Sequence, residues 1–332
     1  MKICMLGAGA MGCTIGGMLA SSGADVIFVD PWREQAEALN LQGLEMHIGD
    51  DVKHIAVTAR ETCAEIGVVD LVIVFVKSFQ TKEAITQAKD IIGDHTMILS
   101  LQNGLGNEEE MMQVIDQSHL ICGRTYAGGS LLRPGVVKAG VVGKETYIGE
   151  PDGSITERIQ RVADLFRHAG LECNVSRNIK GLMWDKLLIN VATSALTSIT
   201  RLPYGPLYEM ESLHECALEA VREGIGVAKS LGIRLSSENP EDAWKKANAN
   251  LPYDFKPSML QGLEAGRRSE IDFINGTVVR FGMQNNVPTP VNKTLVACVK
   301  GIERWIEEFG NRKSSMLRCA QSKGGCRLKV LQ

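Results

Sequence analysis

A lysine and an asparagine stand four residues apart in the middle of an apolar stretch, GLMWDKLLINVATSALTS. At about 100° per residue, a helix would place Asn190, Thr193 and Thr197 within about 40° of Lys186, with Ser194 about 80° away. Leucine, valine and alanine fill most of the remaining circle, so the helix is predicted to be buried apart from one polar stripe. Because buried polar groups need partners, the stripe is predicted to face a wet cleft, a ligand or other polar groups.

Lys186 has chemistry that suits such a stripe. An ammonium at the edge of a dry cleft can donate a hydrogen bond to a carbonyl oxygen and then give up a proton. Glu270 is the expected carboxylate partner. Ser258 and Ser269 are predicted helix N-caps, and a capping box from Ser269 to Asp272 would put Glu270 in a first helical turn. The structural alternatives are a lysine stem on apolar surface with its head in water, and an acid that compensates a helix dipole.

A glycine-rich motif, GAGAMG, follows the first predicted strand directly and opens the first predicted helix. Gly7 permits a tight turn, Gly9 lets the backbone approach a pyrophosphate, and Gly12 lets the helix pack on the strand. The helix N-terminus, with Ala10 and Met11, offers N–H groups to anionic oxygens. This context predicts dinucleotide binding, although glycines also form plain tight turns.

The predicted second strand ends at Asp30, where a carboxylate would accept hydrogen bonds from an adenosine ribose. A ribose 2′-phosphate would be repelled by that charge, although Arg33 could partly offset the repulsion. Asp30 therefore favours NAD(H) over NADP(H). The structural alternative is that Asp30 only begins a turn before Pro31.

The elements that would carry these residues change along the chain. Short β-branched runs at 2–9, 24–30, 69–77 and 96–103 alternate with helical patterns, which indicates a parallel sheet with crossover helices. Strand-like pieces after residue 115 are predicted to be antiparallel additions. We expect an α/β, Rossmann-type dinucleotide-binding domain over residues 1–177.

Helical patterns without strands follow, so residues 178–310 are predicted to form an all-α substrate and catalytic domain. The predicted helices cover 180–200, 211–231, 241–250, 258–265, 269–285 and 290–309. A basic tail, 311–332, is expected to be flexible.

Composition excludes several classes of protein. The 332 residues carry a net charge of −3, which gives no basic field for nucleic acid or lipid, and no apolar run is long enough to span a membrane. Nine cysteines show neither a CxxC pair nor zinc spacing, so we expect reduced thiols, no metal and a cytoplasmic location. The expected partner is a small molecule, and the sequence leaves a monomer and a homodimer open.

Taken together, the motifs resemble the ketopantoate reductase (2-dehydropantoate 2-reductase) family over roughly residues 1–310. The resemblance rests on GAGAMG, VKSFQ, QNGLGN, WDKLLIN and SMLQGLEAGRRSEIDFING. It implies a nicotinamide between a Rossmann domain and a helical domain, with hydride passing from NAD(P)H to the 2-oxo carbon of ketopantoate, a step towards pantothenate and coenzyme A. The matching positions are Lys186 and Glu270 for catalysis, Asn103 and Asn190 for substrate or cofactor, Ser258 for substrate, and Lys77 and Gln80 for the cofactor.

Two departures from the family pattern leave the substrate open. Ser194, a predicted substrate contact, stands where relatives commonly carry asparagine, and Asp30 stands near a position that is usually basic in NADP-specific members. They favour the alternative of an NAD-dependent 2-hydroxyacid dehydrogenase on the same scaffold, acting on a different small 2-oxo acid. A non-catalytic dinucleotide sensor would be expected to lack the Lys186 and Glu270 pair, which is present.

Overall fold

The computed structural model describes residues 1–249 and 251–310, which form two compact units. The first unit comprises Met1–Leu187 and Ala228–Glu238, and the second comprises Leu188–Val227 and the described residues from Asn239 onward. The predicted fold class, a Rossmann-type domain followed by a helical domain, is confirmed. The boundaries predicted at 177 and 310 stay a prediction, and the basic tail lies outside the described residues.

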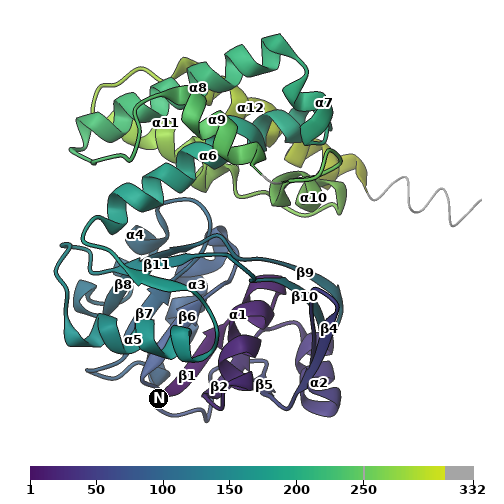
Figure 1. Ribbon diagram of the computed structural model, residues 1–332, viewed down its shortest axis with the longest axis vertical. Coiled ribbons are helices and arrows are strands. Elements are labelled where there is room, and N and C mark those ends of the chain that lie inside the picture. The colour runs from purple at the N-terminus through teal and green to yellow at the C-terminus, as the bar shows by residue number, and fades with distance from the viewer. Residues whose placement is uncertain (250, 311–332) are drawn as a thin grey trace, which may run out of the picture. The chain divides into compact units, whose positions relative to one another are not determined.

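An eight-stranded sheet forms the centre of the first unit, in the order β12-β11-β8-β7-β6-β1-β2-β5 (Figure 1). Its strands are β1 (Lys2–Leu6), β2 (Asp25–Val29), β5 (Thr58–Arg60), β6 (Leu71–Val74), β7 (Met97–Ser100), β8 (Leu120–Thr125), β11 (Thr146–Gly149) and β12 (Cys173–Val175). The helices α1 to α5 of the first unit are α1 (Ala10–Ser21), α2 (Arg33–Gln42), α3 (Thr81–Gln87), α4 (Asn107–Met112) and α5 (Glu157–His168).

Both faces of this sheet are buried. In β1, Ile3 and Met5 belong to one hydrophobic core cluster, whereas Cys4 and Leu6 belong to another. Side chains alternate between the faces of a strand, so a strand that is apolar throughout is covered on both sides. This is why the first strand reads as a continuous apolar run.

The prediction that the strand-like pieces HLICGRTYAGG, GVVKAG and ETYIGE are antiparallel additions is wrong for β8, which lies in the first of them. This strand pairs in parallel with β7, and only β11 pairs with it antiparallel. The chain crosses over through α4 between β7 and β8, and a crossover connection makes consecutive strands parallel.

A second sheet of four strands, unexpected as a unit, packs on α1, with the order β4-β3-β10-β9 (Figure 1). Its strands are β3 (Leu44–Ile48), β4 (Asp51–Ile55), β9 (Gly128–Arg133) and β10 (Val136–Gly140). The parallel pairing of β10 with β3 joins segments about 90 residues apart, so no local pattern announces it.

The second unit is helical. Its elements are the later part of α6 (Ile179–Thr200), then α7 (Tyr204–Tyr208), α8 (Glu211–Ser230), α9 (Pro240–Asn248), α10 (Ser258–Glu264), α11 (Asn275–Gln284) and α12 (Pro290–Trp305). None of the helices within residues 1–249 and 251–310 has the length and apolarity that crossing a membrane requires.

The helix predicted over 269–285 is interrupted. A short 3₁₀ turn covers Ile271–Phe273, and Ile274 adopts φ −111° and ψ −98° before α11 begins. Polar groups of this segment bond to α12: the backbone amide of Ser269 donates to the Glu303 carboxylate over 2.7 Å, and the Asp272 side chain pairs with Lys300. These contacts draw the segment towards α12.

Candidate active site

The glycine loop is tight at both ends and open in its middle. Gly7 has φ +103°, and a Cβ there would lie 2.8 Å from the backbone of Phe75. A Cβ on Gly12 would lie 1.8 Å from the carbonyl oxygen of Gly7, whereas one on Gly9 would meet no protein atom within 4 Å. Only glycine therefore fits the two ends, and the open side at Gly9 leaves room for a ligand to approach the backbone.

Helix α1 begins directly at this opening. Gly9 is its N-cap residue, no side chain caps it, and no acid lies in its first turn. Ala10 and Met11 are partly exposed there. The first amides of a helix lack intrahelical acceptors and carry partial positive charge, so this end fits the pyrophosphate of a dinucleotide.

Asp30 lies beside the loop, immediately after β2. Its Oδ2 accepts a hydrogen bond from the Ala8 amide over 2.7 Å, and its Oδ1 accepts one from the Trp32 amide over 3.0 Å. The carboxylate thus closes a turn, as the structural alternative proposed, and also holds the glycine loop. A carboxylate has further lone pairs, so its predicted contact with a ribose stays a prediction. Arg33 is exposed and pairs with Glu37.

Lys186 reaches the ends of two neighbouring parallel strands. Its Nζ donates to Asn103 Oδ1 over 2.7 Å and to the Thr125 carbonyl oxygen over 2.6 Å. Asn103 follows β7 and Thr125 ends β8. Ligands of open α/β sheets bind at the carboxyl ends of the strands, so Lys186 is held where chemistry on a bound cofactor would take place.

Partly buried hydrogen bonds fix the loop that carries Asn103. The Asn103 carbonyl oxygen accepts hydrogen bonds from Ser78 Oγ over 3.1 Å and from Asn107 Nδ2 over 3.3 Å. Gln102, which the sequence reasoning did not single out, donates to the Val76 carbonyl oxygen over 2.7 Å. The loops after β6 and β7 are therefore cross-linked, which restricts the orientation of the Asn103 amide. The only sequence signal for Gln102 was its place in the QNGLGN motif.

Arg124 fixes the helix that carries Lys186, and the sequence reasoning missed it. Only 7% exposed, it donates from Nη1 to the Leu182 carbonyl oxygen over 2.7 Å and to the Tyr126 hydroxyl over 2.8 Å. Its guanidinium also lies 4.9 Å from the ring centre of Tyr147. One buried cation thus connects α6, one turn before Lys186, to the end of β8.

Hydrogen bonds also hold the start of α6 within the first unit. Besides the Arg124 contact, Asn178 donates to the Arg234 carbonyl oxygen over 2.8 Å, and Asp185 accepts from the Ser236 amide over 3.0 Å. The segment 228–238 therefore packs with the Rossmann fold.

Further along α6, the polar side chains of the predicted stripe bond within the fold. Thr193 is 1% exposed and its hydroxyl lies 3.0 Å from the Tyr204 hydroxyl, while the Thr197 hydroxyl donates to the Thr193 carbonyl oxygen over 2.9 Å. Of the predicted alternatives, these two threonines therefore face other polar groups within the fold, because a helical hydroxyl can bond back to a carbonyl one turn earlier. Asn190 is half-buried, and Ser194 is 5% exposed.

The remaining predicted residues are placed as follows. Lys77 and Gln80 are exposed at the 3₁₀ turn Ser78–Gln80 after β6. Glu270 is half-buried and is the N-cap residue of the turn Ile271–Phe273, so its predicted place inside a first turn is wrong by one position. Ser258 is the exposed first residue of α10 and not its N-cap, because Pro257 holds that position.

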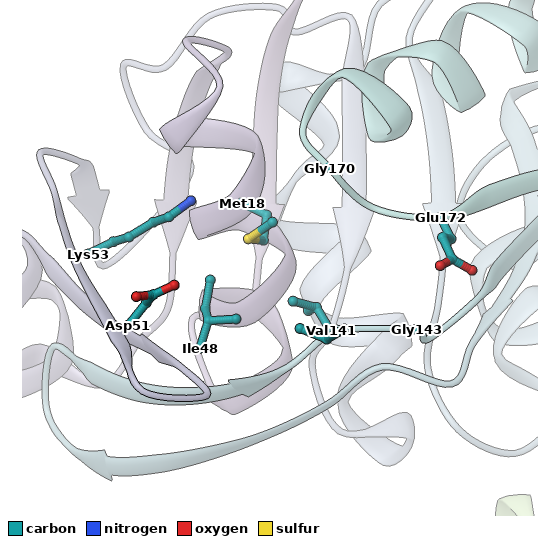
Figure 2. Close-up of a pocket in the computed structure, with 9 residues that line it drawn as sticks. Met18, Ile48, Asp51, Lys53, Val141, Gly143, Gly170 and Glu172 are labelled. Atoms are coloured by element: carbon teal, nitrogen blue, oxygen red, sulfur yellow. The ribbon is translucent and has the colours of Figure 1, made fainter.

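A cavity of about 320 Å³ opens elsewhere in the first unit (Figure 2). Asp51 and Lys53 of β4 lie on one side of it and Glu172 on the other. None of the predicted site residues lines this cavity. Among the residues that the structure describes, no three His, Cys, Asp or Glu side chains gather as metal ligands would.

A glycine loop follows β1, and Lys186 is fixed at the carboxyl ends of β7 and β8 in the same sheet. This arrangement is that of a Rossmann-type oxidoreductase that uses NAD(P)H. Comparison with known protein families identifies one family within this class of oxidoreductases. Residues 3–153 match the family described as "Ketopantoate reductase PanE/ApbA", and residues 178–303 match its C-terminal counterpart. The chain belongs to the ketopantoate reductase family.

Individual relatives agree with this. The 2-dehydropantoate 2-reductase of Pyrococcus horikoshii is 36% identical over 91% of this chain and 98% of its own length. The PanE/ApbA family ketopantoate reductase of Ralstonia eutropha JMP134 superimposes with a TM-score of 0.85 at 31% identity, covering 93% of this chain and all of its own. D-mandelate dehydrogenase, solved with NADH and anilino(oxo)acetate, superimposes with a TM-score of 0.86 at 27% identity, over 92% and 100% of the two chains.

Proposed function

We propose that this protein is a 2-dehydropantoate 2-reductase, which reduces the 2-oxo group of ketopantoate to the hydroxyl of pantoate. The nicotinamide would supply the hydride that forms the new C–H bond at C2. Lys186 would donate its Nζ proton to the ketone oxygen as negative charge develops there. The observation that carries the proposal is the fixed position of the Lys186 ammonium, bonded to Asn103 Oδ1 and to the Thr125 carbonyl oxygen.

Further roles follow from the family resemblance. The glycine loop and helix α1 would bind the pyrophosphate, and Lys77, Gln80 and Asn103 would contact the cofactor. Glu270 would orient the Lys186 ammonium. Fixed polar groups are needed for the carboxylate and hydroxyl of the substrate, and Asn103, Asn190, Ser194 and Ser258 are proposed for them. We infer a cytoplasmic enzyme.

A second candidate is an NAD-dependent dehydrogenase for another 2-hydroxy acid. Asp30 at the end of β2 supports it, because a carboxylate accepts from ribose hydroxyls and repels a 2′-phosphate. The likeness to D-mandelate dehydrogenase, solved with NADH, also supports this candidate.

One assay separates the two candidates. Purified protein is offered a panel of 2-oxo acids that includes ketopantoate and an aromatic 2-oxo acid, each with NADH and with NADPH. The proposed function predicts the highest kcat/KM with ketopantoate. A higher value with another acid would favour the second candidate, and a strong NADPH preference would refute the role given to Asp30.

A further inference from the structure

Gln35 of α2 is a fully buried polar side chain with partners in three different segments. It is 0% exposed. Its Nε2 donates to the Ala8 carbonyl oxygen over 2.8 Å and contacts Cys13 Sγ at 3.3 Å, while its Oε1 accepts from the Gly135 amide over 2.9 Å. Burying an amide is costly unless it is bonded at both ends, and here it is.

These contacts hold the second residue of the glycine loop from both sides. The Ala8 amide donates to Asp30 Oδ2 over 2.7 Å, and the Ala8 carbonyl oxygen accepts from both Gln35 and the Cys13 thiol, the latter over 3.2 Å. Burial raises the pKa of Cys13 to about 12, so this thiol remains a donor at neutral pH. The Ala8 residue is therefore restrained at every backbone polar atom.

The restraint has a directional consequence for Gly9. A peptide bond is planar and trans, so the carbonyl of Ala8 and the N–H of Gly9 point in opposite directions. Because Gln35 holds the carbonyl in the core, the Gly9 N–H is turned away from the core. Gly9 is also where a Cβ would meet no protein atom within 4 Å, on the open part of the loop.

The other end of Gln35 is fixed by the second sheet. Gly135 lies in the turn between β9 and β10 and has φ +73°, and its amide donates to Gln35 Oε1. An amide has one oxygen and one nitrogen end, so this bond determines which end faces Ala8. The hairpin of the second sheet thereby sets the orientation of the group that holds the glycine loop.

We propose that Gln35 is a positioning residue that presents the Ala8–Gly9 peptide to the pyrophosphate of the dinucleotide. Its loss weakens cofactor binding, while hydride transfer from bound cofactor continues. The inference rests on the proposed function only in requiring that the loop binds a dinucleotide.

The test uses two substitutions with matched controls in the same helix. Gln35→Met removes every hydrogen bond at similar volume. Gln35→Glu keeps the acceptor for Gly135 and, when its carboxylate is ionised, loses the donor to Ala8. Asn40 bonds to both backbone polar atoms of Ala59 over 3.0 and 2.8 Å and does not touch the glycine loop, so Asn40→Leu and Asn40→Asp are the controls.

Binding of NADH and NADPH is measured by fluorescence titration, alongside kcat at saturating cofactor and the melting temperature. Both Gln35 variants are expected to raise Kd about tenfold, as loss of one buried hydrogen bond would, with kcat changed less than about twofold. If Gln35→Met does not fold, Gln35→Glu carries the same expectation. A Kd within twofold of wild type in a folded Gln35 variant, or an equal rise in the Asn40 controls, overturns the inference. Wild-type protein that binds neither cofactor would instead refute the proposed function.

Discussion

Replacing Asn103 with aspartate places a negative charge on the atom that orients Lys186. The Nζ to Oδ1 distance is 2.7 Å. At that separation, and with an effective dielectric constant of about 20, two unit charges attract by about 6 kcal/mol, which is an upper bound. The measured effect of such a pair is smaller, because solvent and neighbouring groups relax: an opposite charge beside an ionisable group in a protein shifts its pKa by about 1–3 units. Asn103→Asp should therefore hold the Lys186 proton more tightly by about 1–3 pH units.

The assay is the pH dependence of kcat for 2-oxo acid reduction. If Lys186 donates the proton, the rate falls at high pH as the ammonium is lost. Asn103→Asp should move this alkaline limb upward by about 1–3 pH units and lower kcat at pH 7 by about 10- to 100-fold, because the proton is less readily given up. Asn103→Ala is the control: it removes the acceptor without adding charge, so its limb should not move upward. An unmoved limb in Asn103→Asp would refute the reasoning.

Three further predictions concern the first unit. Burial raises the pKa of Glu108 to about 7, so ionisation of this carboxyl opposes folding, and the free energy of unfolding should fall as pH rises from about 4.5 through 7. In urea unfolding, Glu108→Gln should therefore be more stable than wild type by about 1–2 kcal/mol at pH 8.5, and no more stable at pH 4. Arg124→Met should lower kcat about tenfold and leave the cofactor Kd unchanged, because it loosens the helix that carries Lys186, the proposed proton donor. A changed Kd with normal kcat would contradict this. Gly12→Ala should lower the free energy of unfolding by about 1–3 kcal/mol, because its Cβ would clash with the Gly7 carbonyl oxygen. Gly9→Ala should leave the free energy of unfolding unchanged and weaken cofactor binding. Equal losses of stability in the two variants would contradict the account.

The Rossmann core could be predicted because its signals are local. The apolar run of β1, the glycines after it and the helix pattern that follows are contiguous in sequence, and each is dictated by burial on both sheet faces or by close backbone approach. The second sheet could not be predicted in this way. Most of β4 is exposed, so its residues show little apolar pattern, and the sheet depends on pairing between distant segments.

The candidate site was predicted in its residues but not in its contacts. Lys186 and Asn103 were each singled out, yet they are 83 residues apart and only the fold brings them together. Arg124 and Gln35 gave no signal, because a single charged or polar residue in a strand or helix is usually exposed. Thr193 could not be assigned among the predicted alternatives, since a polar position on a helix wheel does not reveal that its hydroxyl is satisfied within the fold.

The central claim is that Lys186 is the proton donor of a 2-oxo acid reductase, and Lys186→Ala tests it most directly. The measurement is kcat for ketopantoate reduction at saturating NADH or NADPH, with cofactor Kd determined on the same sample. Loss of a positioned general acid should lower kcat by about 10²- to 10⁴-fold while Kd stays within about twofold, because the glycine loop is untouched. Wild-type turnover in a folded Lys186→Ala variant that binds cofactor would contradict the account.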